Sequence, residues 1–329
     1  MTSALLGPVK DVGRRLRVVG LVPTGTFVAA VLALVAAGAP VDPPSWDRLA
    51  TRVRDLTAVQ GIALLLAVVL VVVLVLPAQV GLIRLLEGYW GSTPPAVKLA
   101  KWRRKRHGDR RDQLERDTHA PAGEPLDVER RRAMARAASA LRARYPRAAD
   151  VLPTTLGNAL RAAENRAGGR YGLDTVTVWP RLYAVLPERS ARLVDDLREQ
   201  LDLAANMCVA MLALAVSSAV LLLPHGLWLL VPIGALVVAW LAYRGACTAA
   251  IAHGEGLDMA FDLYRFDLLR TLHLPLPDTW EHERAANAEL TAFFLQGGQF
   301  PLPYNIPEPP PPAVPTPAPP RDDEAPPDD

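Results

Sequence analysis

Cysteine is scarce in this chain of 329 residues, which contains only Cys208 and Cys247. One lies inside an apolar run and the other just past the end of another, so a small disulfide-stabilised scaffold is excluded. Asp, Glu, Lys and Arg are absent from four stretches: residues 21–39, 60–83, 203–224 and 226–243. Uncharged apolar runs of about 20 residues are long enough to cross a bilayer. A single soluble globule is therefore excluded.

The first uncharged stretch is predicted to be a retained transmembrane helix. It has the layout of a signal peptide, because basic residues precede it and Ala37-Gly38-Ala39 could be a cleavage site. Pro40 directly follows this site and disfavours cleavage, and a longer apolar run begins within the next 25 residues. We therefore expect the stretch to remain as the first membrane span.

The second stretch is the most apolar part of the chain and is predicted to be the second span. Residues 61–76 contain only Gly, Ile, Ala, Leu and Val. Pro77 can kink the helix near its end, which a bilayer helix tolerates. The apolar pattern continues to Tyr89 and Trp90, whose side chains suit the headgroup level of a bilayer.

The third and fourth stretches are predicted to form a hairpin. Leu203–Leu223 is followed by Pro224-His225-Gly226 and then by Leu227–Tyr243, and Pro and Gly in this spacing are typical of a turn. Two spans joined by so short a connection must be antiparallel.

The distribution of basic residues predicts the orientation in the membrane. The connection between the first two spans carries three Arg beside three Asp, whereas residues 85–201 carry 23 Lys or Arg. By the positive-inside rule, both termini and the long middle segment are cytoplasmic. The predicted location is the inner (plasma) membrane of a bacterium.

A basic run follows the second span. Its candidate lipid-binding residues are Lys98, Lys101, Arg103, Arg104, Lys105 and Arg106. They could hold anionic lipid headgroups, each contributing about 1 kcal/mol near the surface. The alternative is an ordinary basic flank that stops translocation. Nucleic acid is not expected as a partner, since Trp102 alone offers a stacking ring.

Residues 126–145 are predicted to form a helix, and the segment 152–182 is the most distinctive of the cytoplasmic part. Thr154 or Thr155 can cap a helix that Gly168-Gly169 ends, and Asp174 can cap the next one. Trp179-Pro180 is expected to form a turn or to restart a helix.

The polar residues of this segment are interpreted as a structural latch or an interaction site. The candidates are Asn158, Arg161, Glu164, Tyr171, Asp174, Trp179 and Arg181. In the latch, Arg161 or Arg181 pairs with Glu164 or Asp174 and holds two short helices to the membrane stalk. No catalytic residue is assigned, because the segment contains no Cys or His and no nucleophile–base pair is recognisable.

One helix is predicted to run from about residue 188 into the third span, and the fourth span should project from the membrane likewise. Amphipathic helices are expected at about 257–270 and 280–296. His253, Glu255, Asp258, Asp262 and His273 could be taken as a metal cluster, but His253 and Glu255 diverge on a helix. A solvated or salt-bridged face is preferred, with Arg265 as partner of Asp262, so no metal or cofactor is predicted.

The C-terminal tail is rich in proline. Residues 301–329 contain 13 prolines and several acidic residues, so they cannot bury a core and are expected to be disordered. Pro309–Pro312 could dock in an aromatic groove, which is the alternative.

Several motifs resemble those of a family of actinobacterial multi-pass membrane proteins that has no established activity. They are Leu152-Pro-Thr-Thr-Leu-Gly-Asn-Ala-Leu-Arg-Ala-Ala-Glu164, Tyr171-Gly-Leu-Asp174, Trp179-Pro-Arg-Leu182, Tyr89-Trp90-Gly91 and Phe261-Asp-Leu-Tyr-Arg265. The resemblance covers about residues 60–295. It implies a membrane architecture and no catalytic residues.

Together these observations predict an all-α protein with four transmembrane helices in two hairpins. The expected segments are a cytoplasmic N-terminus (1–20), a first hairpin (21–84), a cytoplasmic helical domain (85–201), a second hairpin (202–252), cytoplasmic amphipathic helices (253–298) and a disordered tail (299–329).

The function predicted is a non-enzymatic membrane scaffold or sensor-partner. Its expected partners are the lipid bilayer, anionic headgroups, a cytoplasmic protein of unknown identity and further copies of the chain. An oligomeric channel or transporter component is the first alternative, although few intramembrane polar groups are available for a path. They are Gln79, Asn206, Ser217, Ser218 and Trp240. A membrane-interface enzyme that uses His253, Glu255, Asp258 and Asp262 is the second alternative.

Overall fold

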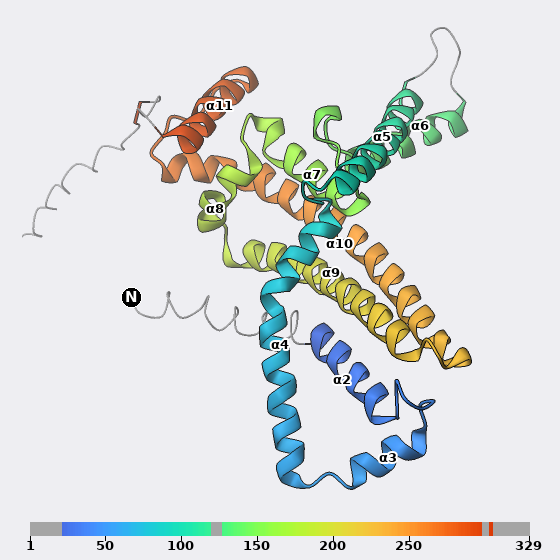
Figure 1. Ribbon diagram of the computed structural model, residues 1–329. Coiled ribbons are helices and arrows are strands. Elements are labelled where there is room, and N and C mark those ends of the chain that lie inside the picture. Colours follow the sequence, from blue (N-terminus) through green and yellow to red (C-terminus); the bar gives the residue numbers. More distant parts are fainter. Residues whose placement is uncertain (1–21, 120–126, 298–302, 305–329) are drawn as a thin grey trace, which may run out of the picture.

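The computed structural model describes residues 22–119, 127–297, 303 and 304. Within these residues the regular elements are all helices, so the all-α prediction is confirmed. The predicted cytoplasmic N-terminus, most of the predicted tail and most of the loop at 118–125 lie outside the described residues. The longest helices run between the two ends of the molecule, and most of the shorter helices gather around one of these ends (Figure 1).

Two long antiparallel helices form the stem of the molecule. They are α9 (Glu188–Leu222) and α10 (Leu230–Thr271), joined by a turn and the short 3₁₀ helix η4 (Gly226–Leu229). Small side chains such as Ala205, Ala246 and Ala250 are buried where the two helices meet. Small residues let helix backbones approach closely, which is the packing that membrane helices use. The predicted hairpin is observed.

Helix α10 continues far beyond its apolar part. Its 42 residues correspond to about 63 Å at 1.5 Å per residue, about twice the thickness of a bilayer core. No break occurs at residues 252 and 253, where the sequence predicted the end of the second hairpin. Gly254 lies inside this helix, and a Cβ there would lie only 2.6 Å from the Cβ of Ala163. The glycine therefore permits a close helix crossing.

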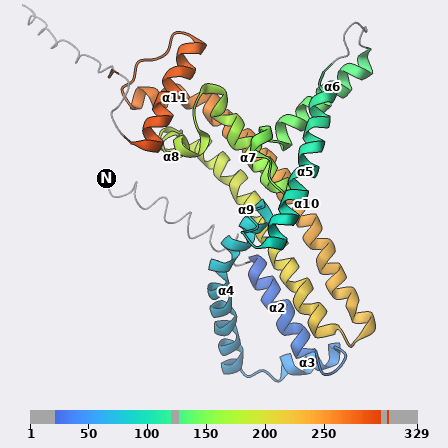
Figure 2. The same ribbon diagram turned by 45° about the horizontal axis from the view of Figure 1, so that its top comes forward.

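The structure describes three helices between residues 22 and 87. They are α2 (Val22–Ala36), α3 (Trp46–Arg54) and α4 (Ala58–Glu87). Thr57 begins α4 with a capping box, in which its Oγ1 accepts from the Gln60 backbone N–H and its own N–H donates to the Gln60 side chain. Gly88 ends α4 with a φ of 103°, a left-handed conformation that favours glycine. In Figures 1 and 2, α2 lies along the stem, whereas α4 lies farther out.

Within the described residues, two helices are long and apolar enough to cross a membrane. These are α9 and the continuous helix Gly226–Thr271. A third is counted if α3 and the start of α4, which are bent by 112°, are one broken span. Helix α2 is apolar but only 15 residues long. The chain is thus consistent with a membrane protein that has two or three recognisable spans.

The polar end of the molecule, which we call the head, consists of short helices around the second half of α10. They are α5 (Pro94–Asp117), α6 (Val128–Arg144), η2 (Ala148–Asp150), α7 (Thr155–Ala167), η3 (Gly169–Tyr171), α8 (Thr175–Val185) and α11 (Trp280–Gln296). Val178, Leu182, Phe261 and Leu268 form much of its core and are almost completely buried. The helices predicted at 126–145 and 280–296 are confirmed, and the basic run lies on α5.

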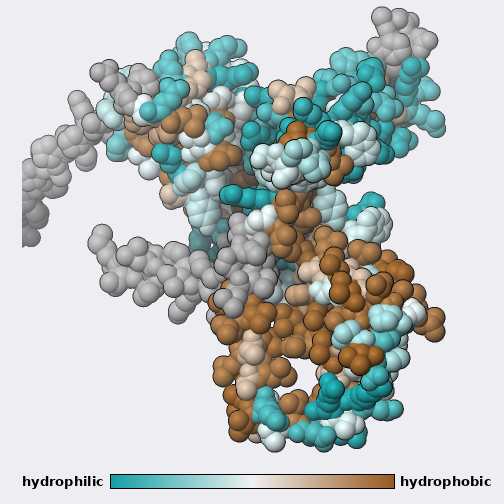
Figure 3. Space-filling view, in the orientation of Figure 1, coloured by the Kyte–Doolittle hydropathy of each residue, from teal (hydrophilic) through white to brown (hydrophobic). Residues whose placement is uncertain are grey.

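Hydropathy divides the face of the molecule seen in Figure 3 into three zones. An apolar zone covers α2, α4 and the hairpin end of the stem. Hydrophilic zones lie on either side of it, a large one over the head and a smaller one around α3. Exposed side chains of the apolar zone include Leu65, Val216, Val220 and Leu236.

Candidate functional site

Asn158 closes the loop that precedes α7. Its side-chain amide donates to the Leu152 carbonyl at 2.8 Å, and its Oδ1 accepts from the Leu152 N–H at 2.7 Å. Thr154 caps α7 by accepting from the Gly157 N–H at 3.1 Å, as the sequence predicted. Asn158 is almost completely buried, so it holds the backbone of this loop and is not available to a ligand.

Arg161 and Glu164 form the ion pair that the latch hypothesis included, at 2.9 Å. Both lie on α7, one turn apart, and their side chains are 40% and 36% exposed. The hydrogen bond with Glu164 raises the pKa of Arg161. An exposed pair within one helix contributes little to stability and joins no second element.

Asp174 and Arg181 both form hydrogen bonds with the backbone of helix α8. Asp174 caps it by accepting from the Thr177 N–H at 2.8 Å, as predicted. Arg181 donates to the Thr177 carbonyl at 2.9 Å, and its guanidinium lies 3.8 Å from the centre of the Phe294 ring. The expected bond from Arg181 to Glu164 or Asp174 is thus replaced by contacts with Thr177 and Phe294.

The turn or helix restart predicted at Trp179-Pro180 is not observed, because α8 runs through both residues. Pro180 lacks an N–H, so this helix loses one internal hydrogen bond. The ring of Trp179 packs 6.4 Å from that of Phe261 in the head core. Trp179 is half-buried against this core, a contact that sequence spacing alone did not reveal.

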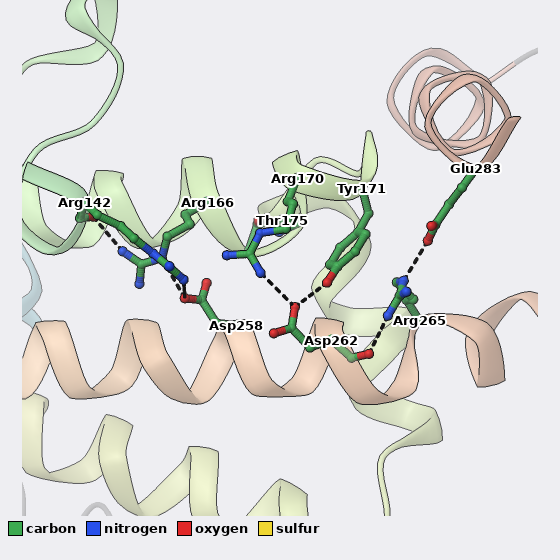
Figure 4. A network of polar contacts seen from close by, with 10 residues as sticks. Arg142, Arg166, Arg170, Tyr171, Thr175, Asp258, Asp262, Arg265 and Glu283 are labelled. Carbon is green, nitrogen blue, oxygen red and sulfur yellow. Dashed lines mark hydrogen bonds and ion pairs between the residues drawn. The ribbon is translucent and has the colours of Figure 1, made fainter. Parts of the chain in front are cut away.

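The contacts that fasten the head to the stem lie along one face of α10, and Figure 4 shows them together. Asp258 accepts from Arg166 Nε of α7 at 2.6 Å and from Arg142 Nη2 of α6 at 3.5 Å. Arg166 also donates to the Arg142 carbonyl at 2.7 Å. The side chains of Asp258 and Arg166 are only 12% and 13% exposed. This group therefore joins α6, α7 and α10 through a largely buried charge pair.

Asp262 makes the next contact along the same face. Its Oδ1 accepts from the Tyr171 hydroxyl at 2.5 Å and from Arg170 Nη1 at 3.3 Å. Burial and the bond to Asp262 raise the pKa of Tyr171, so the phenol keeps its proton and donates. Tyr171 is one of the predicted site residues, and the structure gives it a partner 91 positions away in the sequence.

Arg265 makes the third contact and holds α11. Its Nε donates to Glu283 Oε1 at 2.6 Å, and it also donates to the backbone carbonyl of Asp262. Its guanidinium lies 4.1 Å from the centre of the Tyr171 ring and 4.2 Å from that of Phe266. Arg265 is therefore held between a carboxylate and two rings, and its expected side-chain pair with Asp262 becomes a bond to the backbone.

We call Arg142, Arg166, Arg170, Tyr171, Asp258, Asp262, Arg265 and Glu283 the α10 clamp. Sequence spacing placed the two aspartates on one helical face, but their arginine partners come from distant segments. Each carboxylate of the clamp is paired with arginine or tyrosine. This pairing suits a cluster that holds helices together better than one that supplies a free acid or base.

The residues considered as a metal cluster do not converge. Glu255 is exposed, whereas His253 and Asp258 are buried. In the part of the chain that the structure describes, no group of three or more His, Cys, Asp or Glu side chains could hold a metal ion. His253 Nδ1 and Asp258 Oδ1 are buried and have no hydrogen-bond partner within those residues.

The six residues of the predicted lipid-binding run point in different directions around α5. Arg103 is half-buried and donates to the Pro153 carbonyl at 3.2 Å. Arg106 lies 5.9 Å from the centre of the Trp102 ring. Lys101 and Arg104 line a cavity beside the end of α4. Lys98 and Lys105 are exposed elsewhere on the helix.

No protein-family model, curated protein or solved structure matches this chain. The resemblance to the actinobacterial family therefore stays a prediction.

Proposed function

We propose that this chain is an integral membrane protein of the bacterial plasma membrane whose head is a non-enzymatic scaffold for a cytoplasmic partner protein. The observation that carries the proposal is the continuity of α10 between two chemically different environments. Its first half belongs to the apolar zone of Figure 3, and its second half carries the clamp that holds the head.

Four membrane spans with cytoplasmic termini are the layout that we propose. Helix α4 has 30 residues, about 45 Å at 1.5 Å per residue, which exceeds the roughly 30 Å of a bilayer core. Helix α2 is shorter, but the uncharged stretch around it covers residues 21–39. Its position along the stem supports a span packed on the hairpin (Figure 2). The amphipathic helix α3 then lies on the outer surface, between two hydrophobic helices.

The α10 clamp supports the proposed scaffold role. A head that is fixed to the stem by buried ion pairs presents its outer side chains in a constant geometry. Exposed apolar side chains of the head include Val176, Leu276 and Trp280, which could contact a protein partner. Pre-ordered surfaces bind with a smaller entropic cost than mobile ones.

In-cell photo-crosslinking of the full-length chain tests this proposal. A photoreactive amino acid replaces Val176 in the head, and in a matched control it replaces Val220, an exposed residue of the apolar zone. We expect one adduct of constant mass from position 176 and none of that mass from position 220. The adduct should decrease when Asp258→Ala opens the clamp.

Two outcomes would contradict the scaffold proposal. Adducts of the chain only with itself, as a ladder of homo-oligomers, would favour the channel alternative and call for flux measurements in liposomes. If Asp258→Ala leaves the adduct at position 176 unchanged, partner binding does not depend on the clamp that fixes the head.

A further inference from the structure

A half-open cavity lies beside the connection between α4 and α5, and the proposed scaffold does not use it. Helix α4 ends at Gly88 and α5 begins at Pro94, and a cavity of about 580 Å³ lies beside this connection. Small-molecule sites in proteins commonly have volumes of about 300–1,000 Å³. Its lining includes the cations and aromatic residues Arg84, Tyr89, Trp90, Lys101 and Arg104.

Three cations from two helices face this cavity. Arg84 belongs to α4, whereas Lys101 and Arg104 are one turn apart on α5. Among the described residues no salt bridge involves any of the three. Other arginines of α5 are occupied, since Arg103 binds a carbonyl and Arg111 pairs with Glu115. Within the described residues, none of these three cations is within ion-pair distance of a carboxylate, although Glu87 lies near enough to Arg84 to feel its charge.

The aromatic residues fix the cavity at a definite level along α4. Arg84 is the first charged residue after the uncharged stretch 60–83. The indole N–H of Trp90 donates to the Leu85 carbonyl at 2.8 Å, which holds its ring against the end of the helix. Tyr89 is 56% exposed beside it. Tyr and Trp at the end of an apolar run are typical of the headgroup level of a bilayer.

We infer that this cavity binds the headgroup phosphate of an anionic phospholipid. Guanidinium and ammonium groups donate strong hydrogen bonds to phosphate oxygens. Leu82 and Leu85 are exposed next to the cavity, so acyl chains of the same lipid can lie along α4. A free phosphate ion would gain nothing from this apolar surface. The inference rests on the proposed membrane location of the chain.

The site is narrower than the basic run predicted from the sequence. Arg84 belongs to it although it precedes the run, whereas Lys98, Lys105 and Arg106 do not line the cavity. These three residues therefore provide a matched control, because their replacement removes the same formal charge from the same region.

Native mass spectrometry of the full-length protein in detergent tests the inference. Phosphatidylglycerol or phosphatidylcholine is added, and retained lipid is counted for the wild type, the cavity variant R84Q/K101Q/R104Q and the control K98Q/K105Q/R106Q. We expect the wild type and the control to retain phosphatidylglycerol preferentially. The cavity variant should bind it about tenfold or more weakly, because each basic residue near an anionic lipid contributes to binding.

Three results would overturn the inference. An equal loss in both triple variants would indicate diffuse attraction to the basic helix. Displacement of the lipid by inorganic phosphate at matched concentration would indicate a site for free anions. Equal retention of both lipids by the wild type would exclude headgroup selectivity.

A carbonate wash of membranes separates this inference from the proposed function. If the wild type leaves the membrane in the wash, the membrane proposal fails. If the wild type and both variants stay in the membrane and keep their circular dichroism, but the wild type shows no lipid selectivity, only the cavity assignment fails.

Discussion

At the scale of single residues, Asp258 is one of two buried carboxylates of the clamp that pair with arginine. Its carboxylate contacts Arg166 and Arg142, and little water reaches the first of these pairs. Removing one member of a buried pair leaves the other charge without compensation, and this costs more than the pair contributes. A small chemical change at Asp258 should therefore have a large effect on the head.

We expect Asp258→Ala to lower the free energy of unfolding of the head by about 3 kcal/mol, because Arg166 stays buried without its carboxylate. Thermal unfolding in detergent micelles, followed by circular dichroism, measures the change. The control is Asp267→Ala, which removes the exposed pair with Arg270 and should cost less than about 1 kcal/mol. Equal effects of the two substitutions would contradict the buried pair.

Gly157 is the residue at which α7 touches the end of α4. A Cβ there would lie 1.9 Å from the carbonyl oxygen of Glu87, so Gly157→Ala must move backbone. We expect a loss of about 1–3 kcal/mol, the usual cost of overpacking. Gly108→Ala on α5 is the control, since its Cβ would meet nothing within 4 Å and the helix should gain up to about 1 kcal/mol. Chemical denaturation of both variants measures the difference.

At the scale of elements, the packing of α11 on α10 depends on a few side chains. Glu283 accepts from Arg265, Asn287 donates to the Tyr171 carbonyl at 2.9 Å, and Leu290 is completely buried. The connection between α10 and α11 contains Pro275 and Pro277 and has no regular structure. Docking of α11 therefore relies on contacts of its own side chains.

We expect Glu283→Ala to release α11, because Arg265 then stays buried without a carboxylate partner. Limited proteolysis should then cut the chain between residues 272 and 279 several-fold faster than in the wild type, since cleavage follows the population of the open form. The exposed Glu281→Ala on the same helix serves as the control. Unchanged protection in Glu283→Ala would mean that apolar contacts alone hold α11.

The junction of α4, α7 and α9 places Glu87 in a partly buried position. Burial raises its pKa above the ordinary 4.5, with Glu164 and Asp202 adding to the effect and Arg198 and Arg84 opposing it. The folded state then binds a proton more readily than the unfolded state, so stability falls as the pH rises from 4.5 through the raised folded pKa.

We expect Glu87→Gln to flatten this part of the stability profile and to be more stable than the wild type at neutral pH. The comparison of the two melting curves across this pH range isolates Glu87 from the other carboxylates. A parallel displacement of both curves, with the same slope, would rule out Glu87 as the titrating group.

At the scale of the whole molecule, the charge distribution predicts which end faces the cytoplasm. The head and the basic helix lie at one end, and α3 lies at the other (Figure 1). A membrane-impermeant maleimide added to intact cells should label a cysteine introduced at Trp46 and leave one at Val176 unlabelled, in a background with Cys208 and Cys247 replaced by alanine. Both positions are exposed in the folded chain. Labelling of Val176 instead of Trp46 would reverse the proposed orientation.

The sequence alone determined the features that depend on local composition. Uncharged runs, helix caps such as Thr154 and Asp174, and the turn at Pro224-His225-Gly226 are encoded within a few residues of where they act. The helical class, the hairpin and several helix boundaries followed from these local signals.

Only the tertiary structure decided which charges meet. Asp258 and Arg166 are 92 positions apart, and Asp262 and Tyr171 are 91. No local pattern distinguishes Arg166, which is buried in the clamp, from Arg161, which stays exposed on the same helix. The energy of an ion pair depends on burial and on partners brought together by folding. The clamp and the cavity beside Arg84 are therefore properties of the assembled helices.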